Sequence, residues 1–190
     1  QKGYIVVVVD PRGTGGRGED FKKMTYMKMG KLESEDMVAS ANYLGSLSFV
    51  DPDRIGIWGW SYGGYMSSLA LMMAPDTFKA GIAVAPFIWK YYDTVYSERY
   101  LRKPQDNFEG YNEYSIIANA PKLKSKYLLI HGTGDDNVHF QSAVFLQNAL
   151  INNGTQFESF YYPDKTHSLT GKKTKIHLFT MMTNFVLDNL

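Results

Sequence analysis

The sequence of 190 residues contains no cysteine. Disulfide bonds, thiolate metal sites and a cysteine nucleophile are therefore excluded, whereas the compartment in which the protein works is left open. Long hydrophobic runs are also missing. No segment approaches the roughly 18 consecutive apolar residues that a membrane-spanning helix requires, and no basic-then-apolar leader is visible. Nothing in the printed sequence is therefore expected to cross a membrane or direct export, although it could belong to a longer exported protein.

An excess of charge of either sign is absent too. The 20 basic and 19 acidic residues give a net charge of +1 and are spread along the chain, so no basic stripe predicts binding to nucleic acid. Hydrophobic residues make up 44% of the sequence and aromatic residues 15%, with 14 tyrosines. This length and content are enough for one substantial core, which predicts a single domain. Tyrosine combines an apolar face with a polar tip, which suits the wall of a binding cleft.

Residues 5–9 form an unbroken apolar run. Such a run is typical of a strand that is buried on both faces of a parallel sheet. A strand of this kind needs neighbours, and almost nothing precedes it in the sequence. We therefore expect the amino-terminal part of the domain, with the first strands of its sheet, to lie upstream of Gln1.

The loop after this run spells Gly-x-Gly-x-x-Gly at residues 13–18, the pattern of a dinucleotide-binding turn. That function needs a helix that begins within the glycines and an acidic residue at the end of a second strand about 20 residues later. Residues 19–30 show no clean helical period, and Glu33, Glu35 and Asp36 lead into a helix instead. We therefore interpret the glycines as a tight loop and expect no dinucleotide cofactor.

The rest of the chain alternates between strand and helix patterns. One helix is expected from Ser34, whose side chain would cap it, and Gly45 and the turn at Pro52 would end it. Strands are then expected at residues 54–58, 79–84, 127–131 and 157–161, and helices at residues 65–74, from about residue 140 and from residue 173. This alternation predicts an α/β fold with a mostly parallel sheet and helices on both faces.

One motif dominates the sequence, Gly-Trp-Ser-Tyr-Gly-Gly at residues 59–64. It follows an expected strand and precedes an expected helix, which is the context of a nucleophile elbow. The glycines beside the serine allow a sharp turn that presents the Ser61 hydroxyl at the end of the strand. The backbone N–H of Tyr62 would then point at the oxygen of a bound carbonyl and form one side of an oxyanion hole.

A serine hydroxyl becomes a good nucleophile only when a base removes its proton and an acid holds that base in the correct tautomer. Of the four histidines, His167 stands in the loop between the last strand and the last helix. The other three suit core or surface positions: His131, His139 and His177. An order of Ser, Asp and His along the chain is that of an α/β-hydrolase. The loop after the preceding strand offers Asp135 and Asp136 as the acid, and spacing does not separate them.

Residues 86–121 differ in character, because they hold many aromatic and polar residues and no long apolar period. The aromatic residues that stand out are Trp89, Tyr91, Tyr92, Tyr96, Tyr100, Tyr111 and Tyr114. About half of them could plug the base of a cap over the sheet, and the others could line a binding pocket.

Four blocks of sequence point to one family. Asp-Pro-Arg-Gly-Thr-Gly stands at residues 10–15, and the serine motif at residues 59–64. Tyr-Tyr-Asp-Thr-Val-Tyr-Ser-Glu-Arg-Tyr stands at residues 91–100, and His-Gly-Thr-Gly-Asp-Asp-Asn-Val-His-Phe at residues 131–140. The blocks resemble the catalytic domain of the prolyl oligopeptidase family, and the last two are close to segments peculiar to its dipeptidyl peptidase IV group. The resemblance covers nearly the whole chain and implies an α/β-hydrolase fold that lacks its first strands.

The resemblance also implies roles for individual residues. Asp135, rather than Asp136, would be the acid of a triad with Ser61 and His167. Asn137 would hold the carbonyl of the residue before the scissile one. The walls of a pocket for proline or alanine would be Tyr62, Trp89, Tyr92, Tyr96 and Val138. A rigid aromatic box suits the compact pyrrolidine ring and excludes larger side chains. No metal and no cofactor are implied.

On this resemblance, residues 1–190 are expected to be the carboxyl-terminal catalytic domain of a longer serine exopeptidase that releases amino-terminal dipeptides ending in proline or alanine. The family's second oxyanion donor, a tyrosine hydroxyl, and the β-propeller that binds the substrate's amino terminus would lie upstream. The family also implies peptide partners, a possible homodimer and an exported or cell-surface setting. The alternatives are a prolyl endopeptidase, an acylaminoacyl peptidase or an esterase on the same fold, and a non-enzymatic interaction module.

Overall fold

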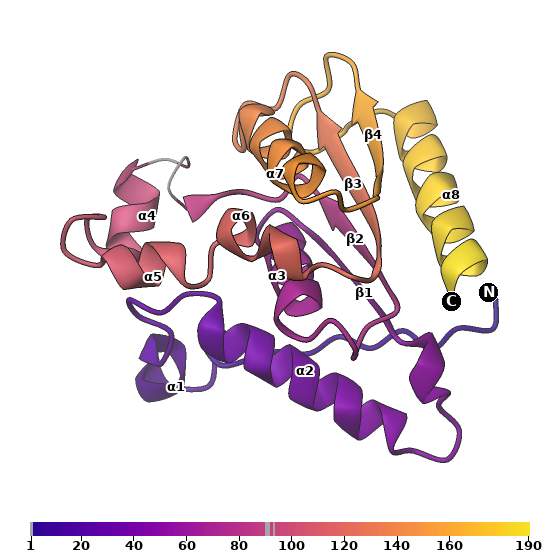
Figure 1. Cartoon of the computed structure of the whole chain (residues 1–190), viewed down its shortest axis with the longest axis horizontal. Helices are drawn as coiled ribbons and strands as arrows, with labels where there is room; N and C mark the ends of the chain where they lie inside the picture. Colours follow the sequence, from indigo (N-terminus) through magenta and orange to yellow (C-terminus); the bar gives the residue numbers. More distant parts are fainter. Residues whose placement is uncertain (1, 90–91, 93) are drawn as a thin grey trace.

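The protein is built around a parallel β-sheet (Figure 1). The computed structural model describes residues 2–89, 92 and 94–190. Within them the sheet has four strands, which are β1 (Gly56–Trp60), β2 (Ala80–Val84), β3 (Lys126–Gly132) and β4 (Glu158–Tyr162). The strands lie side by side in that order and all run in the same direction. The four strands predicted downstream of residue 50 are therefore confirmed, within two residues at either end.

Helices cover both faces of this sheet (Figure 1). On one face lie α3 (Tyr62–Met73) and α7 (Gln141–Asn152), with α2 (Lys31–Gly45) packed against α3, and on the other lies α8 (Lys172–Asn189). The shorter elements are α1 (Glu19–Lys23), η1 (Pro52–Arg54), α4 (Thr94–Leu101), α5 (Phe108–Asn112), α6 (Ile116–Asn119) and η3 (Ala120–Lys122). This arrangement confirms the predicted α/β class. None of the helices described here has the length and apolar content to span a bilayer.

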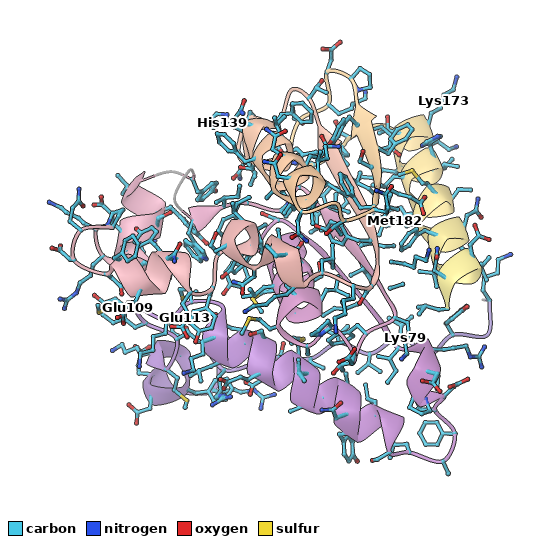
Figure 2. The ribbon with its side chains drawn as sticks, in the orientation of Figure 1. Lys79, Glu109, Glu113, His139, Lys173 and Met182 are labelled. Atoms are coloured by element: carbon cyan, nitrogen blue, oxygen red, sulfur yellow. The ribbon has the colours of Figure 1, made fainter. Side chains whose placement is uncertain are left out.

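Side chains of the strands alternate between two cores. Leu129 of β3 belongs to the core beneath α3 and α7, whereas Leu128 and Ile130 belong to the core beneath α8. The alternation follows from the two-residue period of a strand. Figure 2 shows Met182 pointing from α8 toward the sheet and Lys173 pointing away from it, as expected of a helix with one buried face.

The apolar run at residues 5–9 is not a strand, contrary to the sequence prediction. It pairs with no strand in the part of the chain that the structure describes, and it exposes 80% of Val6 and 89% of Val8. Apolar β-branched residues favour an extended backbone, but only a hydrogen-bonding neighbour turns that backbone into a strand. The apolar pattern indicates the preference for an extended backbone, but it does not indicate whether a neighbouring strand is present.

Helix α2 begins earlier than the sequence predicts. Its first residue is Lys31 and its N-cap is Gly30, so the prediction that Ser34 caps the helix is wrong. The buried Ser34 hydroxyl instead donates to the carbonyl oxygens of Gly30 (2.6 Å) and Lys31 (2.9 Å). Glu33 completes the cap, because its Oε2 accepts a hydrogen bond from the Gly30 amide at 3.0 Å. Gly30 has a φ of 96°, and this left-handed conformation, which favours glycine, lets the helix start one turn earlier.

The glycines at residues 13–18 form a turn, as the sequence predicts, with φ values near 90° at Gly13, Gly16 and Gly18. The short helix α1 follows directly, although residues 19–30 carry no helical period. The loop is tied to α2 by Arg12, whose Nη2 lies 2.7 Å from Oδ1 of Asp36. Asp36 also accepts a hydrogen bond from the Arg12 amide at 2.8 Å. Asp36 therefore holds the loop against the helix, which is a structural role.

Leu146 and Ile151 offer a test of the core beneath α7. Leu146 is fully buried, whereas Ile151 on the same helix is 61% exposed. We expect Leu146→Ala to lower the free energy of unfolding by about 2–5 kcal/mol, because it removes buried methyl groups and leaves a cavity. Ile151→Ala should change it by no more than about 0.5 kcal/mol. Urea titrations of both variants measure this difference, and equal losses would contradict the assigned burial.

Candidate functional site

Ser61 lies in a sharp turn between β1 and α3, as the motif predicts. Its φ of 60° and ψ of −117° are unusual for a residue with a side chain, and such strain is typical of functional turns. The Ser61 amide donates to the Val84 carbonyl oxygen at 2.8 Å, and the Ser61 carbonyl oxygen accepts from the Tyr65 amide at 3.0 Å. The turn is therefore held by the end of β2 on one side and by the first turn of α3 on the other. The helix begins at Tyr62, three residues earlier than expected.

The glycines of the motif have unequal roles. A methyl group on Gly59 would collide with the backbone of Gly63, and one on Gly64 would lie 2.6 Å from the Val84 carbonyl oxygen. A methyl group on Gly63 would meet no heavy atom within 4 Å. The close approach of the strand to the helix thus requires glycine at positions 59 and 64, while position 63 has room for a side chain.

His167 lies in the loop between β4 and α8 and contacts the loop that follows β3. Its Nδ1 is 2.9 Å from Oδ2 of Asp135. Its backbone carbonyl oxygen accepts a hydrogen bond of 3.0 Å from the indole N–H of Trp60, the residue before Ser61. The three residues that the sequence singled out for a triad therefore stand in loops after β1, β3 and β4, at one edge of the sheet. This is the edge where open parallel sheets place their reactive groups.

Asp135 and Asp136, which spacing alone did not separate, have different surroundings. The Asp135 side chain is buried, and its Oδ1 accepts from the amides of Asn137 (3.0 Å) and Val138 (2.8 Å). Asp136 is exposed, and its carboxylate accepts one long hydrogen bond, 3.4 Å, from the His167 amide. Only Asp135 touches the imidazole of His167, so the geometry favours it as the acid.

The Asp135 carboxylate stays ionised in this site. Burial by itself would raise the pKa of Asp135, but hydrogen bonds from His131, His167 and the Asn137 amide outweigh burial and lower it well below the usual range. The ionised Asp135 carboxylate accepts a hydrogen bond from the Nδ1–H of His167. The Nε2 of that ring is then left free to accept a proton.

His131 is also a member of this network, although the sequence predicted only a core or surface position for it and no part in the site. It is fully buried, and its Nε2 lies 3.2 Å from Oδ2 of Asp135 and 2.8 Å from the Val138 carbonyl oxygen. Both neighbours are acceptors, so the proton belongs on Nε2. Its position near the end of a strand, four residues before a candidate acid, is the sequence signal that could have identified His131.

The aromatic residues predicted to line a pocket lie together. The rings of Tyr92 and Tyr96 are 5.1 Å apart, those of Trp89 and Tyr96 are 6.3 Å apart, and those of Tyr62 and Trp89 are 6.2 Å apart. Phe87, which the prediction did not include, lies among them, 4.8 Å from Trp89 and 5.0 Å from Tyr92. A phenylalanine directly after the Ala-Pro at the end of a strand was its only sequence signal.

Other aromatics of this region serve the fold. Tyr111 is buried and donates a hydrogen bond of 2.7 Å to the Arg102 carbonyl oxygen, and Tyr114 is buried with its carbonyl oxygen bound by the Tyr65 hydroxyl. The expectation that the aromatics divide between fold and pocket agrees with these positions. Tyr91 lies outside the described residues.

Asn137 and Val138 connect the acid loop to the aromatic cluster. Oδ1 of Asn137 accepts a hydrogen bond of 2.5 Å from the Tyr92 hydroxyl. Val138 is fully buried and belongs to the same core cluster as Trp89. All the predicted pocket residues thus lie on one contiguous set of contacts. Within the described part of the chain, no group of three or more His, Asp or Glu side chains is arranged to hold a metal ion.

The glycine roles predict opposite outcomes for two matched substitutions. Gly59→Ala should destabilise the fold strongly, since the new methyl group overlaps the backbone of Gly63 and neither segment can move without breaking the turn. Gly63→Ala should be tolerated or slightly stabilising, because the position is helical and open. Thermal unfolding monitored by circular dichroism compares them, and a Gly63→Ala variant as unstable as Gly59→Ala would refute the assignment.

The lowered pKa of Asp135 predicts acid sensitivity. An aspartate in the unfolded chain has a pKa of about 3.9. The stability that ionised Asp135 contributes is therefore present above that pH and is lost as the pH falls toward the lower folded value. Asp135→Asn should flatten the fall in unfolding free energy below about pH 4 relative to the wild type. Denaturant titrations across this range measure the slope in the wild type and in the variant, and identical slopes in the two proteins would count against the assignment.

Comparison with known proteins covers nearly the whole chain. The model of the prolyl oligopeptidase family matches residues 1–190. Prolyl endopeptidase FAP from Homo sapiens is 44% identical over 190 residues, which cover 98% of this chain and 25% of that relative. Dipeptidyl peptidase 4 from Felis catus is 42% identical over 186 residues, which cover 96% and 24%. The crystal structure of dipeptidyl peptidase 4 from Porphyromonas gingivalis has 47% identity and a TM-score of 0.93, over 95% of this chain and 26% of that one.

The chain spans about a quarter of the length of the curated relatives that it matches. Within that quarter the structural match confirms the predicted α/β-hydrolase fold, since 95% of this chain matches the solved structure with a TM-score of 0.93. The family match extends over every residue and agrees with the resemblance that the four sequence blocks carry. The chain therefore belongs to the prolyl oligopeptidase family of serine peptidases.

Proposed function

We propose that the gene product is a serine exopeptidase that removes dipeptides with proline or alanine in the second position from the amino terminus of peptides. The observation that carries the proposal is the hydrogen bond between His167 and a buried, ionised Asp135, in the loops next to a strained serine turn. Such an arrangement supports acyl transfer, because it supplies a nucleophile, a base and an acid that orients the base.

In the proposed reaction Ser61 attacks the carbonyl carbon of the scissile bond, and His167 accepts the serine proton at Nε2. Asp135 stabilises the imidazolium that forms, and the Tyr62 amide donates to the oxyanion of the tetrahedral intermediate. The imidazolium then protonates the leaving amine, which leaves the dipeptide esterified to Ser61. Water, deprotonated by His167, releases the dipeptide and restores the enzyme.

The preference for proline or alanine rests on the aromatic cluster. The residue before the scissile bond would pack against the walls formed by Tyr62, Trp89, Tyr92, Tyr96 and Val138. Rigid rings lose little conformational entropy when they bury a compact pyrrolidine. The Nδ2 of Asn137 would donate a hydrogen bond to the carbonyl oxygen of the preceding residue, while Oδ1 keeps the hydrogen bond that it accepts from the Tyr92 hydroxyl. Relatives that are named dipeptidyl peptidase 4 and dipeptidyl aminopeptidase B support this specificity.

A prolyl endopeptidase is the second candidate, and one observation favours it. The human relative with 44% identity is named a prolyl endopeptidase. Both activities use the same pocket for proline and differ in whether the substrate's amino terminus must be free. An exported or cell-surface setting and a homodimer, which the family resemblance implies, belong to the proposal as well.

The assay uses the full gene product with glycyl-prolyl chromogenic substrates. We expect dipeptide release by the wild type and a loss of turnover on the order of a million-fold in Ser61→Ala. Ser48→Ala, which changes an exposed serine of the same chain, is the matched control and should retain full activity. Activity that survives Ser61→Ala would disprove the mechanism. Equal turnover of a substrate with a blocked amino group would contradict the exopeptidase and favour the endopeptidase.

A further inference from the structure

Glu33 is a buried acid for which the mechanism above has no role. It lies in the first turn of α2 and is only 3% exposed. Its pKa is raised, because burial disfavours the charge more than the hydrogen bonds from Tyr62 and Gly30 favour it. No lysine or arginine compensates it among the residues that the structure describes. A carboxyl in such a place costs stability, so the contacts that it makes require an explanation.

The two oxygens of Glu33 have different partners. Oε2 accepts the Gly30 amide at 3.0 Å and thereby caps its own helix. Oε1 accepts the hydroxyl of Tyr62 at 2.5 Å. The cap needs only one oxygen and would form whether or not Tyr62 were near. The second contact is a separate connection, from α2 to the first residue of α3.

Tyr62 is the residue through which this connection reaches the site. It directly follows Ser61, and its backbone N–H is the proposed oxyanion donor. Its ring packs 5.6 Å from the ring of Tyr65 and 5.8 Å from that of Phe87, in the aromatic cluster of the proposed pocket. One side chain therefore belongs to the pocket wall while its own backbone belongs to the oxyanion hole. Fixing the hydroxyl at the far end of the ring restrains both.

We propose that Glu33 is a positioning residue of the serine turn, which holds the Tyr62 side chain and, through it, the pocket wall and the backbone N–H beside Ser61. Glu33 touches neither substrate nor reacting atoms. Its contribution is to select one placement of the Tyr62 ring, as a hydrogen-bonded support does for a preorganised site. The proposal rests on the proposed function for its substrate readout, but not for its readout at the serine.

The test is a double-mutant cycle of Glu33→Gln and Tyr62→Phe in the full gene product. Tyr62→Phe removes the contact and leaves the cap at Gly30 intact, whereas Glu33→Gln weakens it, because one acceptor oxygen is left for two donors, the Gly30 amide and the Tyr62 hydroxyl. We expect each variant to lower kcat/KM on a glycyl-prolyl substrate by up to about 100-fold, the effect of a small misplacement in a site. The kcat/KM of the double variant should be no lower than that of the less active single variant, because both substitutions act through one contact. Tyr43→Phe, an exposed tyrosine on the same helix, is the control and should match the wild type.

Two further measurements separate positioning from simple loss of stability. The kcat/KM for a glycyl-prolyl substrate, divided by that for a glycyl-alanyl substrate, should fall in Glu33→Gln and Tyr62→Phe. The proline ring is larger than the alanine methyl group and depends more on the pocket wall that includes Tyr62. Glu33→Gln, which keeps a carbonyl oxygen as an acceptor, should retain more activity than Glu33→Ala. An unchanged ratio, or losses that multiply in the double variant, would overturn the proposal.

A fluorophosphonate probe keeps this test independent of the substrate. The probe phosphonylates an activated serine, with a new oxygen–phosphorus bond, loss of fluoride and transfer of the serine proton to the base. We expect the rate of Ser61 labelling to fall in both variants while circular dichroism shows the fold retained. Wild-type labelling without cleavage of glycyl-prolyl substrates would reject the proposed specificity and leave Glu33 testable. Unchanged labelling rates in both variants would reject the role of Glu33.

Discussion

The carboxylate of Asp135 is the group on which the candidate site depends. It accepts hydrogen bonds from two imidazoles and two backbone amides, which occupy both of its oxygens. A buried carboxylate without such partners would take up a proton, and a neutral acid would no longer enforce the tautomer of His167. Because the charge is retained, the ring of His167 is oriented and its Nε2 remains available as a base. His131 belongs to this arrangement as much as His167 does, although only His167 was predicted from the sequence.

The parallel sheet brings these groups to one edge. Ser61, Asp135 and His167 come from loops that are far apart in the chain, and each loop follows the carboxyl end of a strand. Two hydrogen bonds to backbone carbonyl oxygens support this arrangement: the Val84 carbonyl accepts from the Ser61 amide, and the His167 carbonyl accepts from the indole N–H of Trp60. The strain at Ser61 is sustained by this surrounding structure, which overdetermines the turn.

Around this edge the molecule combines rigid aromatic packing with a few polar anchors. The rings of Tyr62, Trp89, Tyr92 and Phe87 pack against one another. The hydroxyls of the two tyrosines are hydrogen-bonded at the periphery, that of Tyr62 to Glu33 and that of Tyr92 to Asn137. Apolar contacts alone leave rings free to slide, whereas a hydroxyl bound to a fixed acceptor selects one placement. Glu33 is costly to bury, and its position beside the serine turn gives that cost a function.

Local chemistry made part of this structure predictable. The serine turn could be read from its glycines, the four strands from their apolar runs, and His167 from its place between strand and helix, because each depends on neighbours in the sequence. The choice of Asp135 over Asp136 came from family resemblance, and burial now gives it a physical basis. The comparisons establish the family directly.

What the sequence by itself determined was the order of elements and the residue types that can carry acyl transfer. The tertiary structure alone decided that residues 5–9 form no strand, that α2 starts at Lys31 and that Ser34 is not its cap. It also placed His131 against Asp135, Phe87 against the ring of Tyr92 and Glu33 against the hydroxyl of Tyr62. The reason is common to all of them. A strand needs a neighbour, a buried histidine needs an acceptor and a buried acid needs donors, and those partners come from segments that are distant in the chain and meet only on folding.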